Sequence, residues 1–428
     1  MSHLGQDIVG VAKDHSDLCT IEEDCEQNNF LSSNGEEQNG SVQLQGESEQ
    51  LDKSNSIENP SVYQKVIDFI IKNFLPLSLI FGVVFGSLVP WPGHYINHKV
   101  TQYLCVVGIF LYSGLFLRTD TLKEALTAFR AVAWGLASIL FITSIIGAHL
   151  TKLLIFDPEN APNRGDNGTT VTSGPYIGPN EFVTGLQVYM CMPCTISSGV
   201  VMVTQLEGNT ALALLLTAVA NVIGVFTIPV LIKWIVAAGV TFQFDLPGLV
   251  VKLSLSMLVP LIVGKLLRFI KQLKTFVYRP RVKLCMKLTN ILLLVAISWM
   301  KISTTSIKGG LKNLTVASVF VVAGWSIAMH LIFLIINICA SFALRLKMDQ
   351  KKCIIILASA KTAAVAIPVV ALLPRSLGDP GLMAIGIIVA HLTVILLDAV
   401  LIAFYLKYEK KKQQKSKAVI SEDEKIVI

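Results

Sequence analysis

Apolar residues in this sequence form long runs that are separated by short polar or Gly- and Pro-containing segments. The runs Ala131–Leu150 and Val316–Phe342, for example, hold no Asp, Glu, Lys or Arg. A helix needs about 20 predominantly apolar residues to cross the hydrocarbon core of a bilayer. Runs of this length therefore predict membrane-spanning helices.

The breaks between the runs divide the chain into ten expected spans, so the expected fold is an all-α polytopic membrane protein. The spans are expected near Phe74–Pro90, Gln102–Leu117, Ala131–Leu150, Phe182–Thr204, Thr210–Val236, Leu246–Leu267, Leu288–Thr305, Thr315–Leu344, Cys353–Leu373 and Leu382–Tyr405.

The composition supports a membrane environment. The 428 residues are 53% hydrophobic and 15% charged, with a mean hydropathy of +0.62, whereas a soluble domain has about a quarter charged residues. The formal charge of +7 does not indicate nucleic acid, because Lys and Arg gather in short clusters between the apolar runs and at the C-terminus. Such clusters are typical of topology signals. We expect the lipid bilayer as a partner, and no nucleic acid.

The positive charges predict that both termini are cytoplasmic, because cytoplasmic loops carry an excess of Lys and Arg. In this orientation the inner side receives Arg118, Lys123, Arg130, the seven basic residues from Arg268 to Lys287, Arg345, Lys347, Lys351, Lys352 and the run that starts at Lys407. The outer side keeps Lys99, Lys152, Arg164, Lys308, Lys312 and Arg375. The loop 157–180 then lies outside, where the sequon at Asn167 predicts glycosylation.

The two ends of the chain differ from its middle in composition. Residues 1–59 hold thirteen acidic residues against Lys13 and Lys53 and have no apolar periodicity, which predicts a disordered cytoplasmic tail over residues 1–60. This segment has neither the basic start and apolar core of a signal peptide nor the composition of a transit peptide. We expect a transmembrane domain over residues 61–408 and a basic cytoplasmic tail over 409–428.

The fourth and ninth expected spans are interrupted in the middle and occupy the same position in their halves. Ten spans with both ends inside divide into five plus five, so the second half has inverted topology. In inverted repeats the solute site lies near the bilayer midplane, where the corresponding broken helices meet. We therefore expect a 5+5 inverted repeat whose broken fourth and ninth helices meet and carry the site.

Both interruptions combine Pro with small and hydroxyl residues. The candidate site residues are Pro193, Thr195, Ser197 and Ser198 in the fourth span, and Ser359, Lys361, Thr362 and Pro368 in the ninth. Pro frees backbone carbonyls, which need partners inside a membrane. Carbonyls and hydroxyls suit a cation, while half-helix N-termini suit an anion. The alternative is that Pro only kinks these helices and the small residues only allow close packing.

The residues around the first break resemble those of a known transporter family. Cys191–Val200 and Gly208–Ala213 are similar to the fourth and fifth spans of the bile acid:sodium symporter superfamily. Phe74–Leu77 and Ser113–Thr119 also match, and the likeness covers roughly Phe74–Tyr408. Within the superfamily, the sequence is similar to the sodium/bile acid cotransporter 7-like branch and to the plant sodium/metabolite cotransporters.

The resemblance implies a ten-span fold in which a core domain, with the crossing helices, moves against a panel domain. It also implies sodium ligands in the fourth, fifth and ninth spans. Carried over to this sequence, Thr195, Ser197, Ser198 and Thr217 fall on hydroxyl positions of the family. Asn221, one turn after Thr217, is expected to face the core.

The sequence departs from the family in the ninth span. Sodium-coupled members have a Glu there and, four residues on, a Gln, whereas this sequence has Lys361 and Val365; Ala213 also replaces a hydroxyl. An ammonium cannot ligate sodium and would repel it strongly if both were close and poorly hydrated. The coupling ion, sodium or a proton, is therefore left open, and no other cofactor is expected.

Three ionisable residues in the spans are further candidates. Insertion of the charged Lys361 side chain near the bilayer centre costs roughly 2.5–3.5 kcal/mol, which suggests a functional role. Lys361 would either replace a sodium ion as a tethered cation or bind an anionic substrate. The alternative is that its side chain extends to a span end or is neutral. Asp398 and His391 lie on one face of the tenth span, where they are candidates for a charge partner of Lys361 or a proton relay. His330 is expected to be a packed polar group.

These features favour a secondary active transporter of the symporter type for an organic anion or related metabolite. The alternative, implied by the resemblance, is a regulator of intracellular calcium at plasma or Golgi membranes. An enzyme is not expected, because the sequence has no HExxH, GxSxG or Walker motif. The acidic N-terminal segment favours the plasma membrane or Golgi-type membranes over a chloroplast or mitochondrion. The solute, the stoichiometry and the oligomeric state do not follow from the sequence.

Overall fold

The structure is a computed structural model that describes residues 66–67, 70–71, 74–116, 128–156, 177–195, 198–237 and 245–426. The expected N-terminal tail, the sequon at Asn167 and the candidate ligand Ser197 lie outside these residues.

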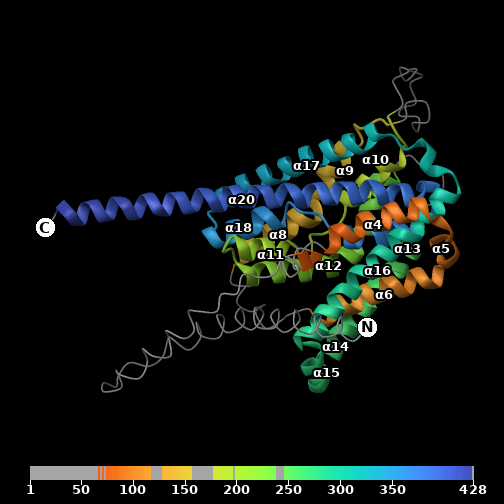
Figure 1. Cartoon of the computed structure of the whole chain (residues 1–428), viewed down its shortest axis with the longest axis horizontal. Helices are drawn as coiled ribbons and strands as arrows, with labels where there is room; N and C mark the ends of the chain where they lie inside the picture. Colours follow the sequence, from red (N-terminus) through yellow and green to blue (C-terminus); the bar gives the residue numbers. More distant parts are fainter. Residues whose placement is uncertain are drawn as a thin grey trace. The chain divides into compact units, whose positions relative to one another are not determined.

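Within the described residues the chain is helical and contains no strand. Figure 1 shows the helices in order along the chain. Their bounds are α4 Phe74–Leu88, α5 Pro90–Ile96, α6 Lys99–Leu115, α8 Phe129–Ala137, η1 Ser138–Ile142, α9 Thr143–Thr151, α10 Glu181–Met190, α11 Ser198–Gln205, α12 Thr210–Leu231, η2 Ile232–Val236, α13 Leu246–Leu253, η3 Ser254–Leu258, α14 Val259–Leu267, α15 Lys271–Val277, α16 Pro280–Ile307, η4 Gly310–Asn313, α17 Val316–Ala343, α18 Met348–Leu357, α19 Ala363–Leu372, η5 Arg375–Leu377 and α20 Pro380–Ile426.

Each of the ten predicted spans corresponds to one helix or to two or three consecutive helical segments. Among the described residues, six helices are long and apolar enough to cross a membrane, and α4 with α5, bent by 99°, makes a seventh if the pair counts as one span. The helix α6 has 17 residues. The fourth and ninth spans consist of half-helices of 8 to 10 residues, α10 with α11 and α18 with α19. The all-helical membrane fold is confirmed, while the inverted repeat stays a prediction.

The break in the ninth span lies in the first part of the stretch Ala358–Pro368 that we expected to carry it. The helix is interrupted between Leu357 and Ala363, and Pro368 lies buried inside α19. The Thr362 hydroxyl accepts a hydrogen bond from the Ala364 amide and so begins a new helix. Pro368 is the sixth of the ten residues of α19, where its missing amide removes one helical hydrogen bond. Pro368 therefore lies beyond the break, and its place in the site stays a prediction.

The described chain divides into two compact units. One contains α15 and the N-terminal part of α16, within residues 270–291, together with the described residues up to Leu77. Two apolar residues of this unit, Ile270 and Phe276, are exposed. They line a surface hollow together with Lys271 and Arg279. The other unit comprises residues 78–269 and 292–428 and holds both broken spans.

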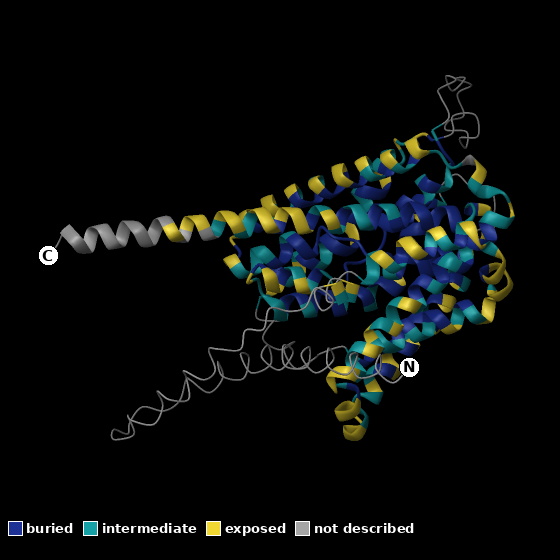
Figure 2. Cartoon of the chain, viewed as in Figure 1, coloured by how far each residue is buried: buried dark blue, intermediate teal, exposed yellow. Residues whose placement is uncertain are grey.

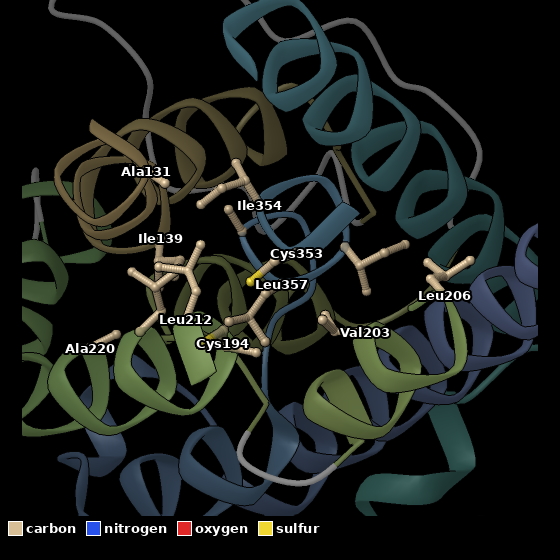
Figure 3. Close-up of a cluster of buried hydrophobic side chains, with 14 of the residues drawn as sticks. Ala131, Ile139, Cys194, Val203, Leu206, Leu212, Ala220, Cys353, Ile354 and Leu357 are labelled. Carbon is tan, nitrogen blue, oxygen red and sulfur yellow. The ribbon is translucent and has the colours of Figure 1, made fainter. Parts of the chain in front are cut away.

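The larger unit has a buried core around the first break. Figure 3 shows Cys194 from the break close to Leu212 and Ala220 of α12 and to Ile354 and Leu357 of α18. All five residues are fully buried. In contrast, exposed apolar residues line the outer side of α17 in Figure 2, as expected of a surface that faces lipid. The core therefore fixes the first break between the fifth and ninth spans.

The tenth span continues as a helix beyond its expected cytoplasmic end. The helix α20 runs to Ile426 and includes the basic run that starts at Lys407 (Figure 1). Near this end the Tyr405 hydroxyl donates to the Glu409 carboxylate at 2.6 Å, and Lys352 Nζ lies 3.7 Å from the same carboxylate. The contact of Lys352 with Glu409 connects α20 to the first half of α18.

Candidate functional site

The first break lies between α10 and α11. Helix α10 ends at Met190, a turn follows, and the chain is not helical from Pro193 to Thr195. The Thr195 hydroxyl accepts a hydrogen bond from the Gly199 amide at 2.8 Å, so it caps the start of α11. Ser198 is the first residue of α11 and is partly buried. The Thr195 hydroxyl at this break therefore begins a half-helix.

The two breaks are joined by a backbone hydrogen bond. The Thr362 amide donates to the carbonyl of Pro193 at 3.1 Å, although neither residue belongs to a regular helix. The Tyr189 hydroxyl adds a second link, because it donates to the Lys361 carbonyl at 3.1 Å. Interrupted helices leave backbone groups that need partners inside a membrane. Here the interruptions of the fourth and ninth spans supply some of these partners to each other.

Two residues of the fifth span contact the first break. The Asn221 amide donates to the carbonyls of Thr217 and Cys194, at 2.7 and 3.4 Å. Thr217 Oγ1 lies 3.8 Å from the Cys194 thiol. Thr217 and Asn221 are 4% and 6% exposed, and Asn221 Oδ1 is buried without a hydrogen-bond partner. The prediction that Asn221 faces the core is confirmed, and its Oδ1 is an oxygen available to a cation.

Lys361 is the central charged residue of the crossing, and it is 3% exposed. Its ammonium donates to the Ile139 carbonyl and to the Ser144 hydroxyl, both at 2.8 Å. It is therefore held inside the bundle and does not extend to a span end. Among the described residues no carboxylate forms an ion pair with it. A buried ammonium without a counter-charge is costly in a membrane and usually has a functional reason.

The partners of Lys361 come from an irregular turn in the third span. Residues Ser138–Ile142 form a π-helical turn, η1, between α8 and α9. Single π turns widen a helix locally and occur often at functional sites. The Ile139 carbonyl accepts from Ser144 Oγ as well as from Lys361. The sequence of this span has no Pro and no Asp, Glu, Lys or Arg, and its Ser and Thr residues did not lead us to predict the turn.

Asn337 is a buried polar residue that our sequence analysis missed. It is 0% exposed, and its Oδ1 accepts from Trp134 at 3.1 Å and from Ser138 at 2.8 Å. Its Nδ2 donates to the Ser359 hydroxyl at 3.1 Å. Asn337 thus connects α17 with the third span and the second break. Its spacing of seven residues from His330 puts both on one helix face, a signal that was present in the sequence.

The partner of Asp398 differs from the one we expected. Asp398 Oδ1 lies 2.7 Å from His330 Nε2, and both side chains are 1% exposed. His391 instead faces Tyr189, with its Nδ1 3.3 Å from the Tyr189 hydroxyl. Asp398 thus forms its ion pair with His330 and not with Lys361, while the proton relay stays a prediction. His330 is buried, as expected of a packed polar group, and in addition it pairs with Asp398. The helices α17 and α20 pack side by side and bring His330 to Asp398.

A small cavity lies between Lys361 and His330. It has a volume of about 10 Å³, which is close to the space that one water molecule needs. Its polar lining consists of Tyr189, Ser326, His330, Ser359 and Lys361. The crossing of the two breaks thus has an ammonium, an imidazole and three hydroxyls around one small cavity.

The chain was compared with families of known proteins. Residues 73–407 match the model of the SBF-like CPA transporter family, a range that contains both breaks and all ten spans. The chain belongs to this family. It is therefore a multi-pass membrane transporter, and the absence of enzymatic motifs agrees with membership of a family of transporters.

Known proteins that are similar to this chain support the family assignment. The probable sodium/metabolite cotransporter BASS4, chloroplastic, of Arabidopsis thaliana is 31% identical over 83% of this chain and 77% of its own length. Its counterpart in Oryza sativa subsp. indica is 29% identical over 81% of this chain and 78% of its own. Sodium/bile acid cotransporter 7 of Mus musculus is 28% identical over 39% of this chain and 43% of its own. The predicted resemblance is confirmed.

Proposed function

We propose that this family member is a secondary active transporter that carries a small organic anion by alternating access at the crossing of its two broken helices. The observation that supports it most is the hydrogen bond from Thr362 to Pro193, with the Lys361 ammonium buried beside it. Interrupted helices that meet at mid-membrane are the usual solute site of transporters with internal repeats.

An organic anion is the solute class that the charge of the site favours. Lys361 forms no ion pair with a described carboxylate, so an anionic solute would supply the missing counter-charge. The half-helices α11 and α19 also begin at the breaks, and helix N-termini favour negative charge. The relatives are named as cotransporters of metabolites or bile acids, and both names are compatible with carboxylate-bearing solutes.

Lys361 is proposed to occupy the place of a coupling sodium ion. The relatives are named as sodium cotransporters, but the resemblance puts Lys361 and Val365 where sodium-coupled members have Glu and Gln. Thr195, a proposed sodium ligand, has its hydroxyl engaged with the Gly199 amide. The remaining candidates, Thr217 and the free oxygen of Asn221, form an incomplete set for sodium beside a fixed ammonium.

For the membrane we propose the plasma membrane or a Golgi-type membrane, with both termini cytoplasmic. The distribution of Lys and Arg supports this orientation. The plant relatives are named as chloroplastic, so an organelle membrane is the alternative that the localisation experiment must separate from these two. Fluorescent tags on either terminus, with and without selective permeabilisation, test both parts of the proposal.

Uptake into proteoliposomes tests the proposed function. The probes are radiolabelled taurocholate, pyruvate, succinate and citrate, a panel that covers conjugated bile acids and mono-, di- and tricarboxylates. We expect the wild type to exchange at least one of them, and Lys361→Ala to lower that exchange by about tenfold or more, equivalent to at least 1.4 kcal/mol. Lys233→Ala is the matched control, because Lys233 is an exposed Lys in a span.

The same assay separates the transporter from the calcium-regulator alternative. A carrier needs the crossing, so variants there should remove exchange while the protein remains folded. Normal exchange by Lys361→Ala would contradict a direct role of this residue. If the wild type exchanges no anion of the panel, and calcium entry in cells follows changes in the N-terminal segment, the regulatory function is favoured.

A further inference from the structure

The His330–Asp398 pair is a buried, ionisable pair that the proposed solute site does not explain. Both side chains are 1% exposed, and the Nε2 to Oδ1 distance is 2.7 Å. His330 lies near the middle of α17, 14 residues after its start. Ionisable residues at this depth are costly and typically line pathways for ions or protons. A purely structural contact between α17 and α20 could be made by apolar residues at lower cost.

The second ring nitrogen of His330 is available to a proton. Its Nδ1 is buried and has no hydrogen-bond partner among the described residues. When Nε2–H donates to the Asp398 carboxylate, Nδ1 carries a lone pair and is an acceptor. A carboxylate at this distance stabilises the imidazolium that forms on protonation. His330 and Asp398 together therefore form a proton acceptor within the bundle.

A proton donor lines the same cavity. Lys361 and His330 both border the volume of about 10 Å³, which is close to the space of one water molecule. Ser326 and Ser359 supply further hydroxyls to its wall. One water in this cavity would connect the Lys361 ammonium, a donor, with the unpartnered Nδ1 of His330, an acceptor.

We propose that Lys361 and the His330–Asp398 pair exchange a proton across this cavity, and that transport by this protein is coupled to protons. The proton leaves Lys361 Nζ, which becomes a neutral amine, and the bridging water passes a proton to His330 Nδ1. The product is an imidazolium paired with the Asp398 carboxylate, so the total charge of the three groups does not change. Net coupling arises when the crossing opens to one side, where the anion binds and Lys361 takes up a proton. The crossing then opens to the other side, where the anion leaves and the His330–Asp398 pair releases a proton. The inference rests on the proposed transport function.

The other titratable groups around the pair have different contacts. On α10 the Tyr189 hydroxyl is engaged with the Lys361 carbonyl and lies beside His391 of α20. The thiols of Cys191 and Cys194, which have Cys-x-x-Cys spacing, are both free and buried. Helix α18 also packs on α17, and its Lys351 lies over the Phe342 ring at the far end of α17. Asp398 is the one carboxylate among the described residues that pairs with a group lining the cavity.

The test compares gradient-driven accumulation with exchange. Proteoliposomes in sodium-free buffer receive the anion that the wild type exchanges, first with equal pH on both sides and then with an inward proton gradient of about 2 pH units, which corresponds to about 100-fold in proton activity. We expect the wild type to accumulate the anion only with the gradient. An imposed sodium gradient at equal pH is the alternative driving force, and it should be without effect.

Variants of the pair connect this coupling to the structure. In Asp398→Asn and His330→Gln we expect the ratio of gradient-driven accumulation to exchange to fall by about tenfold or more, because the pair can no longer hold the proton. His149→Gln is the matched control: His149 lies on α9 and contacts the Ile145 carbonyl of its own helix, so its ratio should equal that of the wild type.

The outcomes distinguish the two proposals. Exchange without pH-driven accumulation, or accumulation that follows the sodium gradient, overturns proton coupling but leaves the proposed transport function valid. No exchange of any anion overturns both. If both variants fail to fold, the wild type decides: its exchange rate should follow a pH profile with a titration that sodium does not shift, and a flat profile between about pH 5 and 9 contradicts the inference.

Discussion

Asn337 is a single residue that connects three elements. It accepts hydrogen bonds from Trp134 and Ser138 and donates one to Ser359, and it is fully buried. In a membrane interior such bonds lack competition from water, yet each contributes only about 0.6 to 2 kcal/mol. Several bonds to one side chain therefore matter more than any single one, and they position Ser359 next to the second break.

We expect Asn337→Ala to destabilise the protein by about 1–3 kcal/mol, because it leaves buried donors without acceptors. Thermal unfolding in detergent measures the effect. Ser341→Ala is the control, since the Ser341 hydroxyl bonds only to the Asn337 carbonyl of its own helix, and its midpoint should stay near that of the wild type. Equal midpoints for the two variants would show that the network of Asn337 does not stabilise the fold.

At the scale of elements, α6 and α14 pack so closely that Gly is required at their contact. A Cβ added at Gly114 would overlap the Leu261 carbonyl, and one added at Gly264 would overlap the Leu111 carbonyl. The neighbouring atoms are backbone, which cannot move aside as a flexible side chain would. Small residues let membrane helices approach in this way, and van der Waals contact then stabilises the pair.

Gly114→Ala and Gly264→Ala should each cost about 1–3 kcal/mol, because overpacking must push the two helices apart. Gly324→Ala in α17 is the matched control, as nothing lies within 4 Å of its added Cβ. There the higher helix propensity of Ala should leave stability equal or slightly raised. Reversible unfolding of the three variants ranks them, and a Gly324→Ala variant as unstable as the other two would contradict this account.

For the whole molecule, the question is which ion stabilises the transporter. A ligand that binds only the folded state raises stability by about 2.7 kcal/mol at a concentration of 100 Kd. If Lys361 takes the place of sodium, the wild type should show the same unfolding midpoint in sodium and in potassium. In Lys361→Glu, which restores the carboxylate of the sodium-coupled members, the midpoint should rise with sodium alone.

Purified protein in matched sodium and potassium chloride series provides this measurement. A sodium-specific rise in the wild type would mean that Thr217, Asn221 and the freed carbonyls bind sodium without the family's Glu, and it would contradict the proposed role of Lys361. The Lys233→Glu variant adds the same charge on an exposed position, so it separates site binding from a general effect of charge.

The sequence by itself determined the class of the protein and the order of its spans. The thickness of the bilayer and the need to satisfy every backbone group impose long apolar helices, whatever their neighbours are. For this reason Thr210–Val236 and Leu246–Leu267 were predicted to the residue. Pro and hydroxyl residues also marked both interruptions, although Pro368 itself lies inside the helix that follows the second one.

Only the tertiary structure decided how the polar residues are paired. Lys361 contacts Ile139, which is 222 positions away, and His330 contacts Asp398, 68 positions away. Helical periodicity places two residues on a face, but it does not say which other helix that face meets. The π turn of the third span likewise depends on its neighbours, because its free carbonyl is stabilised by an ammonium from another span. Partners across helices follow from packing, which no local pattern in the chain encodes.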